Sequence, residues 1–300
     1  MHSRFSSDTA LVVLSGGQDS TTCLLLARRA YKTVHAITFD YNQRHRREIL
    51  AARRVAALVG VESHEIVTLG PILSSTSPLT DPQQSLEQYP SFPEMEQTIG
   101  DRVELTFVPM RNVLFMTLAF NRAVALGAGA VITGICQQDG TNYPDCTAAF
   151  AWQMQSLAHE ALGLPLAPVL SMPYLLAPLL NITKADSIRQ LLLAVDTQER
   201  DLAAGALAFS HTAYDGAYPP TGSDHATVLR EEGFRRAGVM DPIRVRAWME
   251  NLLPLPEGDP RSADLLHDPN HWLTGAVAKA MTKLDMKNLY MKNLYDGREG

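Results

Sequence analysis

The residues with the clearest chemical potential lie near the start of the chain, where Ser15-Gly16-Gly17-Gln18-Asp19-Ser20 follows the apolar run Leu11–Leu14. The apolar run predicts a short buried strand, and the pattern after Ser20 predicts an amphipathic helix. A strand, a glycine turn and a helix N-terminus gather free backbone N–H groups and the positive end of a helix dipole at one point. The two glycines let the backbone approach a ligand closely, and the two serines add hydroxyl donors. We therefore predict that this loop binds phosphate.

Further polar segments follow predicted strands or precede predicted helices. Phe39–His45 follows the second strand, beside the first loop, where the adenosine part of a nucleotide would rest. Phe107–Asn112 places an Arg near a helix start, and a guanidinium matches the geometry of a transferred phosphate. Thr133–Asp139 and Tyr143–Cys146 supply carboxylates and a phenol for the N–H edge of a purine-like ring. Asn181–Asp186 brings a Lys at a predicted helix start.

The elements that must position these segments alternate between strand and helix. This order predicts an α/β fold, with a doubly wound parallel sheet whose ligand lies at the carboxyl ends of the strands. Residues 74–104 have no clear periodicity and are expected to form a lid or an irregular loop. The predicted strands are Leu11–Leu14, Thr33–Phe39, Glu62–Thr68 and Ala130–Ile135. The predicted helices are Thr21–Ala30, Arg46–Val59, Asn112–Leu126, Ala148–Ala161, Val245–Leu253 and Trp272–Leu284.

Composition limits the possible partners and location. A formal net charge of −6 argues against general nucleic-acid binding. The longest apolar stretch, around Leu118–Ile135, is interrupted by Arg122, so no membrane partner is expected. The N-terminus has no signal-peptide pattern, and three cysteines do not make a disulfide framework. We therefore expect a cytoplasmic protein. The repeated Met-Lys-Asn-Leu-Tyr at 286–290 and 291–295 has no assigned role.

The motifs taken together resemble a known family. Ser-Gly-Gly-x-Asp-Ser resembles the pyrophosphate (PP) loop of the ATP-pyrophosphatase superfamily, and the motifs from about Leu11 to about Asp241 resemble the 7-cyano-7-deazaguanine synthase (QueC) family. The resemblance implies a Rossmann-like sheet of the adenine nucleotide alpha hydrolase type. It implies a PP-loop ATP-pyrophosphatase domain at 1–200, a helical region at 201–300, and a homodimer. It also implies that MgATP adenylates the carboxylate of 7-carboxy-7-deazaguanine, with release of pyrophosphate, before an amine attacks.

The resemblance implies a role for individual side chains as well. The catalytic residues would be Arg44, His45, Arg111 and Lys184. ATP would be bound by Leu14, Ser15, Gly16, Gly17, Gln18, Asp19, Ser20, Phe39, Tyr41 and Gly134. The deazaguanine would be bound by Gln43, Asn112, Gln138, Asp139, Tyr143 and Asp145.

The chain departs from the family near its C-terminus. The family normally carries four cysteines there that bind a structural zinc ion, and the corresponding positions here are occupied by Ala213, Thr221, Asp224 and Thr227. No thiolate remains, and Asp224 with His225 is too little for a closed tetrahedral site. We therefore predict no structural zinc and no other metal site in the protein itself.

Two further departures lie nearer the chemistry. Met110 stands where the family has Gly, and Thr147 stands where it has Arg. The motifs expected to bind ATP are thus intact, whereas those expected to bind the acceptor are altered. Three interpretations of the function remain open. The first is conjugation to a protein amine, as implied by likeness to zinc-less QueC-like proteins of type IV CBASS antiphage operons. The second is a queuosine-precursor nitrile synthase that uses ammonia, and the third is a non-catalytic nucleotide- or partner-binding module.

Overall fold

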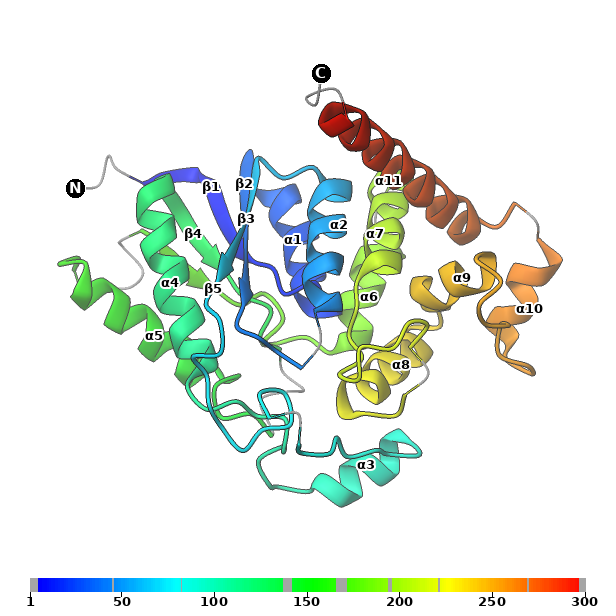
Figure 1. Ribbon diagram of the computed structural model, residues 1–300, viewed down its shortest axis with the longest axis horizontal. Coiled ribbons are helices and arrows are strands. Elements are labelled where there is room, and N and C mark those ends of the chain that lie inside the picture. The colour runs from blue at the N-terminus through cyan, green and yellow to red at the C-terminus, as the bar shows by residue number, and fades with distance from the viewer. Residues whose placement is uncertain are drawn as a thin grey trace.

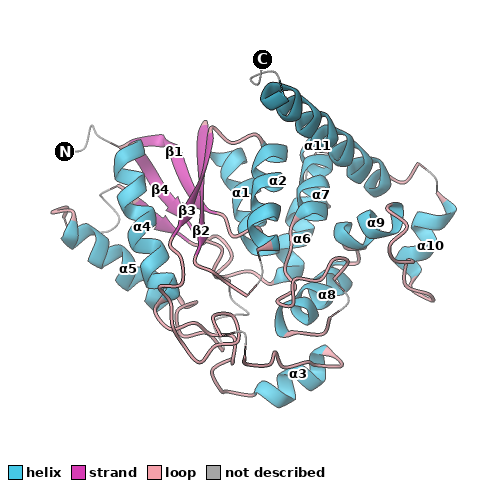
Figure 2. Cartoon of the chain, viewed as in Figure 1, coloured by secondary structure: helices cyan, strands magenta, loops and turns pink. Residues whose placement is uncertain are grey.

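The centre of the protein is a sheet of five parallel strands in the order β3-β2-β1-β4-β5 (Figures 1 and 2). A computed structural model describes residues 5–44, 46–81, 83–136, 142–165, 172–193, 196–220, 222–268 and 270–296, with side chains up to residue 286. The strands are β1 (Ser6–Val13), β2 (Thr33–Asp40), β3 (Ser63–Thr68), β4 (Ala128–Ile132) and β5 (Tyr174–Leu176). The predicted doubly wound parallel sheet is therefore confirmed, and β5 is a strand that the sequence patterns missed.

Helices cover both faces of the sheet (Figure 1). Ala10 and Val12 of β1 face one side, where they share a core with α1 (Gln18–Ala30), α2 (Arg47–Val59) and α7 (Thr197–Phe209). The alternate residue Leu11 faces α4 on the other side. The remaining helices are α3 (Phe92–Ile99), α4 (Arg111–Leu126), α5 (Ala148–Ala161), α6 (Lys184–Leu192), α8 (His225–Ala237), α9 (Pro242–Met249), α10 (Pro260–His267) and α11 (Trp272–Asp296).

The register of the sheet brings the predicted polar segments to one edge. Val12 pairs with Ala36 of β2 and with Ile132 of β4. Because the three strands run parallel, the residues that follow them emerge at the same edge of the sheet. The phosphate loop, the segment after Asp40 and the segment after Ile132 are therefore neighbours.

Helix α1 begins earlier than predicted. It starts at Gln18 rather than Thr21, so Gln18, Asp19 and Ser20 belong to its first turn. The N-cap residue is Gly17, and no side chain caps the helix. The first N–H groups of a helix have no partner within the helix, so this end offers donors to a ligand.

The segment 74–104 contains a helix that the sequence pattern missed. Ser91 caps α3 by accepting a hydrogen bond from the backbone N–H of Glu94. Met95 and Ile99 on α3 form an apolar cluster with Val228 and Leu229 on α8. A single pair of apolar residues four positions apart is weak evidence for a helix in a sequence. The burial of this pair depends on α8, which lies far along the chain.

The C-terminal helices share the main core. Leu273 and Val277 on α11 belong to the same apolar cluster as Leu207 on α7 and Val12 on β1. The predicted helix at 245–253 corresponds to α9, which starts at Pro242 and ends at Met249, and α11 extends well beyond the predicted end at residue 284. The proposed division near residue 200 falls inside α7 and stays a prediction. No helix in the described ranges is long and apolar enough to cross a membrane.

Two glycines permit close approaches around the first turn of α1. Gly16 has a φ of +92°, and a Cβ built there would lie 2.3 Å from the carbonyl oxygen of Glu48. A Cβ on Gly134 would lie 2.9 Å from the backbone nitrogen of Ser20. Only residues without a side chain allow α2 and the end of β4 to pack this closely against the loop.

We predict that Gly16→Ala destabilises the fold more than Gly60→Ala, a matched control at the end of α2. Gly60 also has a positive φ, +76°, but a Cβ there meets nothing within 4 Å. Backbone strain alone costs about 1 kcal/mol, and overpacking adds about 1–3 kcal/mol at Gly16. Urea unfolding of both variants measures the difference, and equal losses would contradict the importance of the close contact.

Candidate functional site

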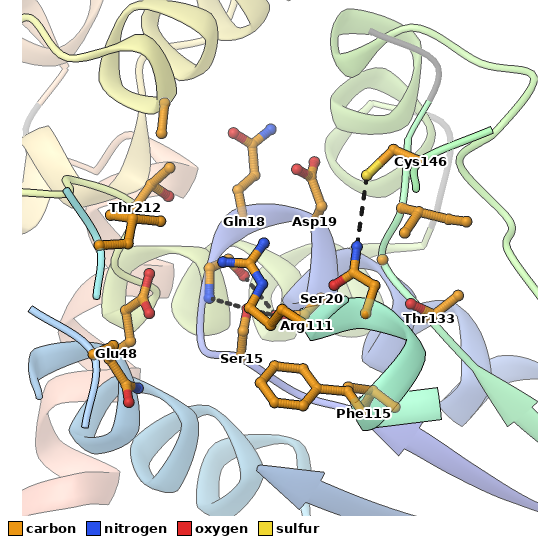
Figure 3. A pocket seen from close by; sticks show the side chains of 18 of the residues that line it. Ser15, Gln18, Asp19, Ser20, Glu48, Arg111, Phe115, Thr133, Cys146 and Thr212 are labelled. Atoms are coloured by element: carbon orange, nitrogen blue, oxygen red, sulfur yellow. Dashed lines mark hydrogen bonds between the residues drawn. The ribbon is translucent and has the colours of Figure 1, made fainter. Parts of the chain in front are cut away.

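A cavity of about 230 Å³ lies at the carboxyl edge of the sheet (Figure 3). It brings together residues that sequence analysis selected from separate segments. Those that line it are Leu14, Ser15, Gly17, Gln18, Asp19, Ser20, Phe39, Tyr41, Gln43, Arg44, Arg111, Asn112, Gly134 and Lys184. Gly16 is outside the lining because it packs against α2. His45, Gln138 and Asp139 lie outside the described residues, so their assignments stay predictions.

The phosphate loop is held by its own two serines. The Ser15 and Ser20 hydroxyl oxygens are 3.0 Å apart, and Ser20 Oγ accepts a hydrogen bond from the N–H of Gly16 at 3.2 Å. Ser15 Oγ accepts from the N–H of Gly17 at 3.3 Å. Beside this loop, the buried Nε2 of Gln18 has no hydrogen-bond acceptor among the described residues. An unsatisfied buried donor is costly, so the arrangement favours an anionic ligand at this point.

A buried ion pair joins the phosphate loop to α6. Lys184 is 7% exposed, and its Nζ donates to Asp19 Oδ2 at 2.6 Å. The same ammonium contacts Cys136 Sγ at 3.5 Å. Thr183 caps α6, so Lys184 occupies the first helical position as predicted. The fold thus places a cation next to the loop expected to bind phosphate.

Aromatic residues form the wall below the end of β2. Phe39 stacks on Phe115 of α4 with ring centroids 4.5 Å apart, and Tyr41 lies against the same ring at 5.4 Å. All three side chains line the cavity. A planar apolar surface of this kind suits a heteroaromatic ring.

Arg111 lies at the centre of the cavity, between the aromatic wall and the phosphate loop (Figure 3). It donates to the Tyr41 hydroxyl at 3.4 Å, and its buried Nε has no acceptor among the described residues. Burial opposes its charge, but Tyr41, Tyr214 and Asp145 outweigh this effect, so that the pKa of Arg111 is raised. The residue is therefore a permanent cation with donors available for an oxyanion.

Asn112 and Asp145, two of the residues predicted to hold a deazaguanine, lie together at one wall of the cavity. Asn112 Nδ2 is 3.9 Å from Cys146 Sγ, which also lines the cavity. Asp145 is buried, and burial raises the pKa of its carboxyl group despite the opposing charge of Arg111. Tyr143 hydrogen-bonds to Thr106 at 2.6 Å, behind the lining. The structure thus places Tyr143 and Asp145 beside the cavity rather than on its surface, and their predicted role is untested.

Arg44, predicted to be catalytic, contacts the 74–104 segment. Its guanidinium donates to the carbonyl oxygen of Gln84 at 2.8 Å and to that of Pro78 at 3.3 Å. The neighbouring Gln43 accepts from the N–H of Tyr41 at 3.1 Å. Arg44 therefore ties the segment above the cavity to the end of β2.

Sequence analysis missed several residues that line the cavity. Glu48, on the first turn of α2, is one of them, and its position just after the polar segment 39–45 is a local signal that was available. Phe115 on α4 was also missed, although it lies one helical turn after Arg111. Further missed residues come from distant segments: Thr212 and Tyr214 follow α7, and His225 opens α8. Their approach to the cavity depends on tertiary packing, so no local pattern indicates it.

Asp224 organises this distant wall. It is 1% exposed and caps α8 by accepting from the N–H of Thr227 at 3.0 Å. Its other oxygen accepts from the N–H of Tyr214 at 3.0 Å and from the Thr227 hydroxyl at 3.2 Å. Ala213, Asp224 and Thr227 stand at positions where the resemblance places zinc-binding cysteines. In this protein the Asp224 carboxylate accepts hydrogen bonds from Tyr214 and from Thr227, and so connects the segment after α7 to α8.

The two departures near the chemistry have local explanations. Met110 precedes α4 with a φ of +64°, the left-handed region that glycine adopts most easily. The backbone thus keeps a conformation suited to glycine although the residue is Met, whose side chain is 64% exposed. Thr147 caps α5 by accepting from the N–H of Phe150 at 3.1 Å. Its hydroxyl serves the helix, and no guanidinium is present at this position.

Comparison with known proteins identifies the family. The family model described as "Queuosine biosynthesis protein QueC" matches residues 9–238. The chain belongs to the QueC family. The matched region holds almost the whole sheet, the phosphate loop, Arg111, Lys184 and α8, whereas α9, α10 and α11 lie beyond it.

Curated relatives agree with this family. A 7-cyano-7-deazaguanine synthase from Gloeobacter violaceus is 44% identical over 234 residues, which is 78% of this chain and 94% of that protein. The synthase from Laribacter hongkongensis is 41% identical over 81% of this chain and 97% of that protein. Among solved structures, NMN synthetase from Francisella tularensis is 13% identical, with a TM-score of 0.35 over 90% of this chain and 87% of that chain. A TM-score this low adds nothing to the assignment.

We predict that Asp224→Ala lowers the free energy of unfolding by about 3 kcal/mol, since it removes a helix cap and leaves a buried N–H unpaired. Asp196→Ala is the matched control, because Asp196 caps α7 from an exposed position and should cost only about 1 kcal/mol. Urea unfolding measures both. Equal losses would mean that Asp224 acts as a cap alone.

We predict that Met110→Gly stabilises the protein by about 1 kcal/mol by removing left-handed strain. Met110→Ala keeps a Cβ and should give no such gain, which makes it the control. Thermal unfolding of the two variants provides the measurement. A gain in both would show that the exposed methionine side chain, rather than its backbone, is unfavourable.

Proposed function

We propose that this QueC-family protein adenylates the carboxylate of 7-carboxy-7-deazaguanine and transfers the acyl group to an amine. The observation that carries the proposal is the convergence of the phosphate loop, Lys184 and Arg111 on one cavity. A carboxylate is a poor electrophile, and adenylation gives it a leaving group. Arg111 would stabilise the negative charge that develops on the carbonyl oxygen during attack.

The residues present suit ATP as the substrate. The uncapped N-terminus of α1, the unpaired Gln18 Nε2 and the Lys184 ammonium provide donors for the phosphates. The Phe39–Phe115 stack provides an apolar surface for adenine. Asp19, in the first turn of α1, would hold Mg²⁺, which would supply positive charge to offset that of the phosphates. Family membership supports the same nucleotide chemistry.

We infer that the acceptor is the amine of a protein, such as an exposed N-terminal glycine, in antiphage defence. The inference depends on the acceptor half, where Thr147 caps a helix instead of supplying a guanidinium and Asp224 stands at a zinc-cysteine position. A second candidate is synthesis of 7-cyano-7-deazaguanine from ammonia. It is favoured by relatives at 38–44% identity that carry the name of that synthase.

The acceptor can be identified by mass spectrometry of the purified protein with MgATP, 7-carboxy-7-deazaguanine and either ammonium or a peptide with an N-terminal glycine. We expect AMP in both mixtures and an amide-linked peptide in the second. Formation of the nitrile from ammonium would establish the second candidate instead. If no AMP forms with either amine, the protein is a binding module and the proposal is wrong.

We predict that Arg111→Lys slows adenylation by about 10²-fold, because an ammonium lacks the guanidinium fork that matches the geometry of the phosphate under attack. Arg122→Lys is the matched control, since Arg122 lies on the same helix and pairs with Glu65 away from the cavity. Exchange of labelled pyrophosphate into ATP, dependent on the deazaguanine, measures this step. Equal rates for the two variants would remove Arg111 from the proposed mechanism.

A further inference from the structure

Glu48 is a cavity residue to which the proposed adenylation step gives no role. Its backbone lies directly behind the phosphate loop, because Gly16 has no Cβ and the Glu48 carbonyl approaches within 2.3 Å of where one would stand. Its side chain extends from the first turn of α2 into the cavity, on the same side as Thr212 (Figure 3). The fold therefore fixes this carboxylate beside the phosphate-binding loop.

Two carboxylates line the cavity within the described ranges, and their situations differ. Asp19 is held by the Lys184 ammonium at 2.6 Å, so that its charge is neutralised by a partner. The Glu48 side chain makes no hydrogen bond or ion pair with any residue that the structure describes. It is only partly buried, so its oxygens remain accessible from the cavity. A partnerless carboxylate in a cavity is available to accept a proton from a ligand.

The surroundings of Glu48 tune its acidity. Burial raises its pKa to about 7, Arg111 opposes this rise, and Asp224 adds to it. Tyr41 also faces the same region from the end of β2, and burial raises the pKa of its hydroxyl. Arg111 and Asp224 come from α4 and from the cap of α8, so the balance depends on three packed elements. A proton acceptor is most effective when its pKa is near the working pH.

Among the described residues on this wall, His225 could also accept a proton, but it is buried and its ring packs against Tyr143 with centroids 5.7 Å apart. Glu48 differs in that it is only partly buried and has Arg111 as a neighbouring cation. An oxyanion-stabilising cation and a proton acceptor in one cavity are the two groups that amine attack on an acyl group requires.

We propose that Glu48 is the general base of the acyl-transfer step, an assignment that rests on the proposed function. The amine nitrogen attacks the carbonyl carbon of the acyl-adenylate and forms the C–N bond. The bond from that carbon to the phosphate oxygen breaks, and AMP leaves with the electron pair. The Glu48 carboxylate takes the proton that the nitrogen loses, and passes it to water after product release. Adenylation itself does not need this proton transfer.

The test separates the two half-reactions in Glu48→Gln. We expect deazaguanine-dependent pyrophosphate exchange to be unchanged and amide formation to fall by about 10²-fold. The rate of amide formation in the unaltered protein should rise with pH through the carboxyl pKa of about 7, because only the ionised group accepts a proton. Glu48→Gln should lose the part of this rise that the carboxyl group causes, and should keep the part that follows deprotonation of the attacking amine. Hydroxylamine, a strong nucleophile that is unprotonated at neutral pH, should restore much of the acyl transfer.

Each other outcome has a distinct meaning. Loss of exchange in Glu48→Gln would assign the residue to binding of ATP or the deazaguanine and overturn the general-base role. Equal amide formation in Glu48→Gln and in the control Glu62→Gln, on the exposed turn before β3, would also overturn it. Absence of exchange in the unaltered protein would instead overturn the proposed function, and the assignment of Glu48 with it.

Discussion

The whole site depends on how closely the first turn of α1 is held between its neighbours. Gly16 allows α2 to touch the loop from one side, and Gly134 allows the end of β4 to touch Ser20 from the other. These contacts leave no room for side chains and fix the direction of the helix end. The free N–H groups of that end therefore point to a defined place above the sheet. Glu48 and Lys184 take their positions from the same packing, through α2 and α6 respectively.

Charge in the cavity is arranged around this fixed point. Lys184 forms an ion pair with Asp19, so a cation lies next to the phosphate loop without an unpaired charge being buried. Arg111 has no carboxylate partner within 4 Å among the described residues and keeps a buried donor unsatisfied. Unsatisfied donors are costly in a folded protein and are retained where a ligand completes them. The same reasoning applies to an acceptor, the Glu48 carboxylate, which has no partner among the residues that the structure describes.

Local sequence patterns were sufficient for four of the five strands and for the phosphate loop, whereas β5 was missed. The strands at Thr33 and Ser63 and the helix after Arg46 carry their periodicity within a few residues, and they were predicted to within a residue or so. The start of α1 was placed three residues late because Gln18, Asp19 and Ser20 are polar and lack an apolar pattern. Helix α3 was missed because its apolar residues are buried against α8, which lies far along the chain. The cavity residue Tyr214 was missed because its position depends on a hydrogen bond to Asp224, the cap of α8.

The segment from Thr212 to Thr227 shows how a wall of the cavity is held by hydrogen bonds. Asp224 connects Tyr214 and the start of α8, and Arg230 connects α8 to α7 and to Asp241 before α9 through hydrogen bonds of 2.6 to 3.1 Å. Loss of either Asp224 or Asp241 would leave buried donors without an acceptor. Both carboxylates are therefore needed to hold this region in its folded arrangement. Tyr214 and Leu229 of this region line the cavity, so the hydrogen bonds of Asp224 and Arg230 hold segments that form part of the site. Helix α9 lies beyond the region that matches the family, yet the backbone N–H of its Ile243 also donates to Asp241. The extension is therefore physically continuous with the catalytic half of the protein.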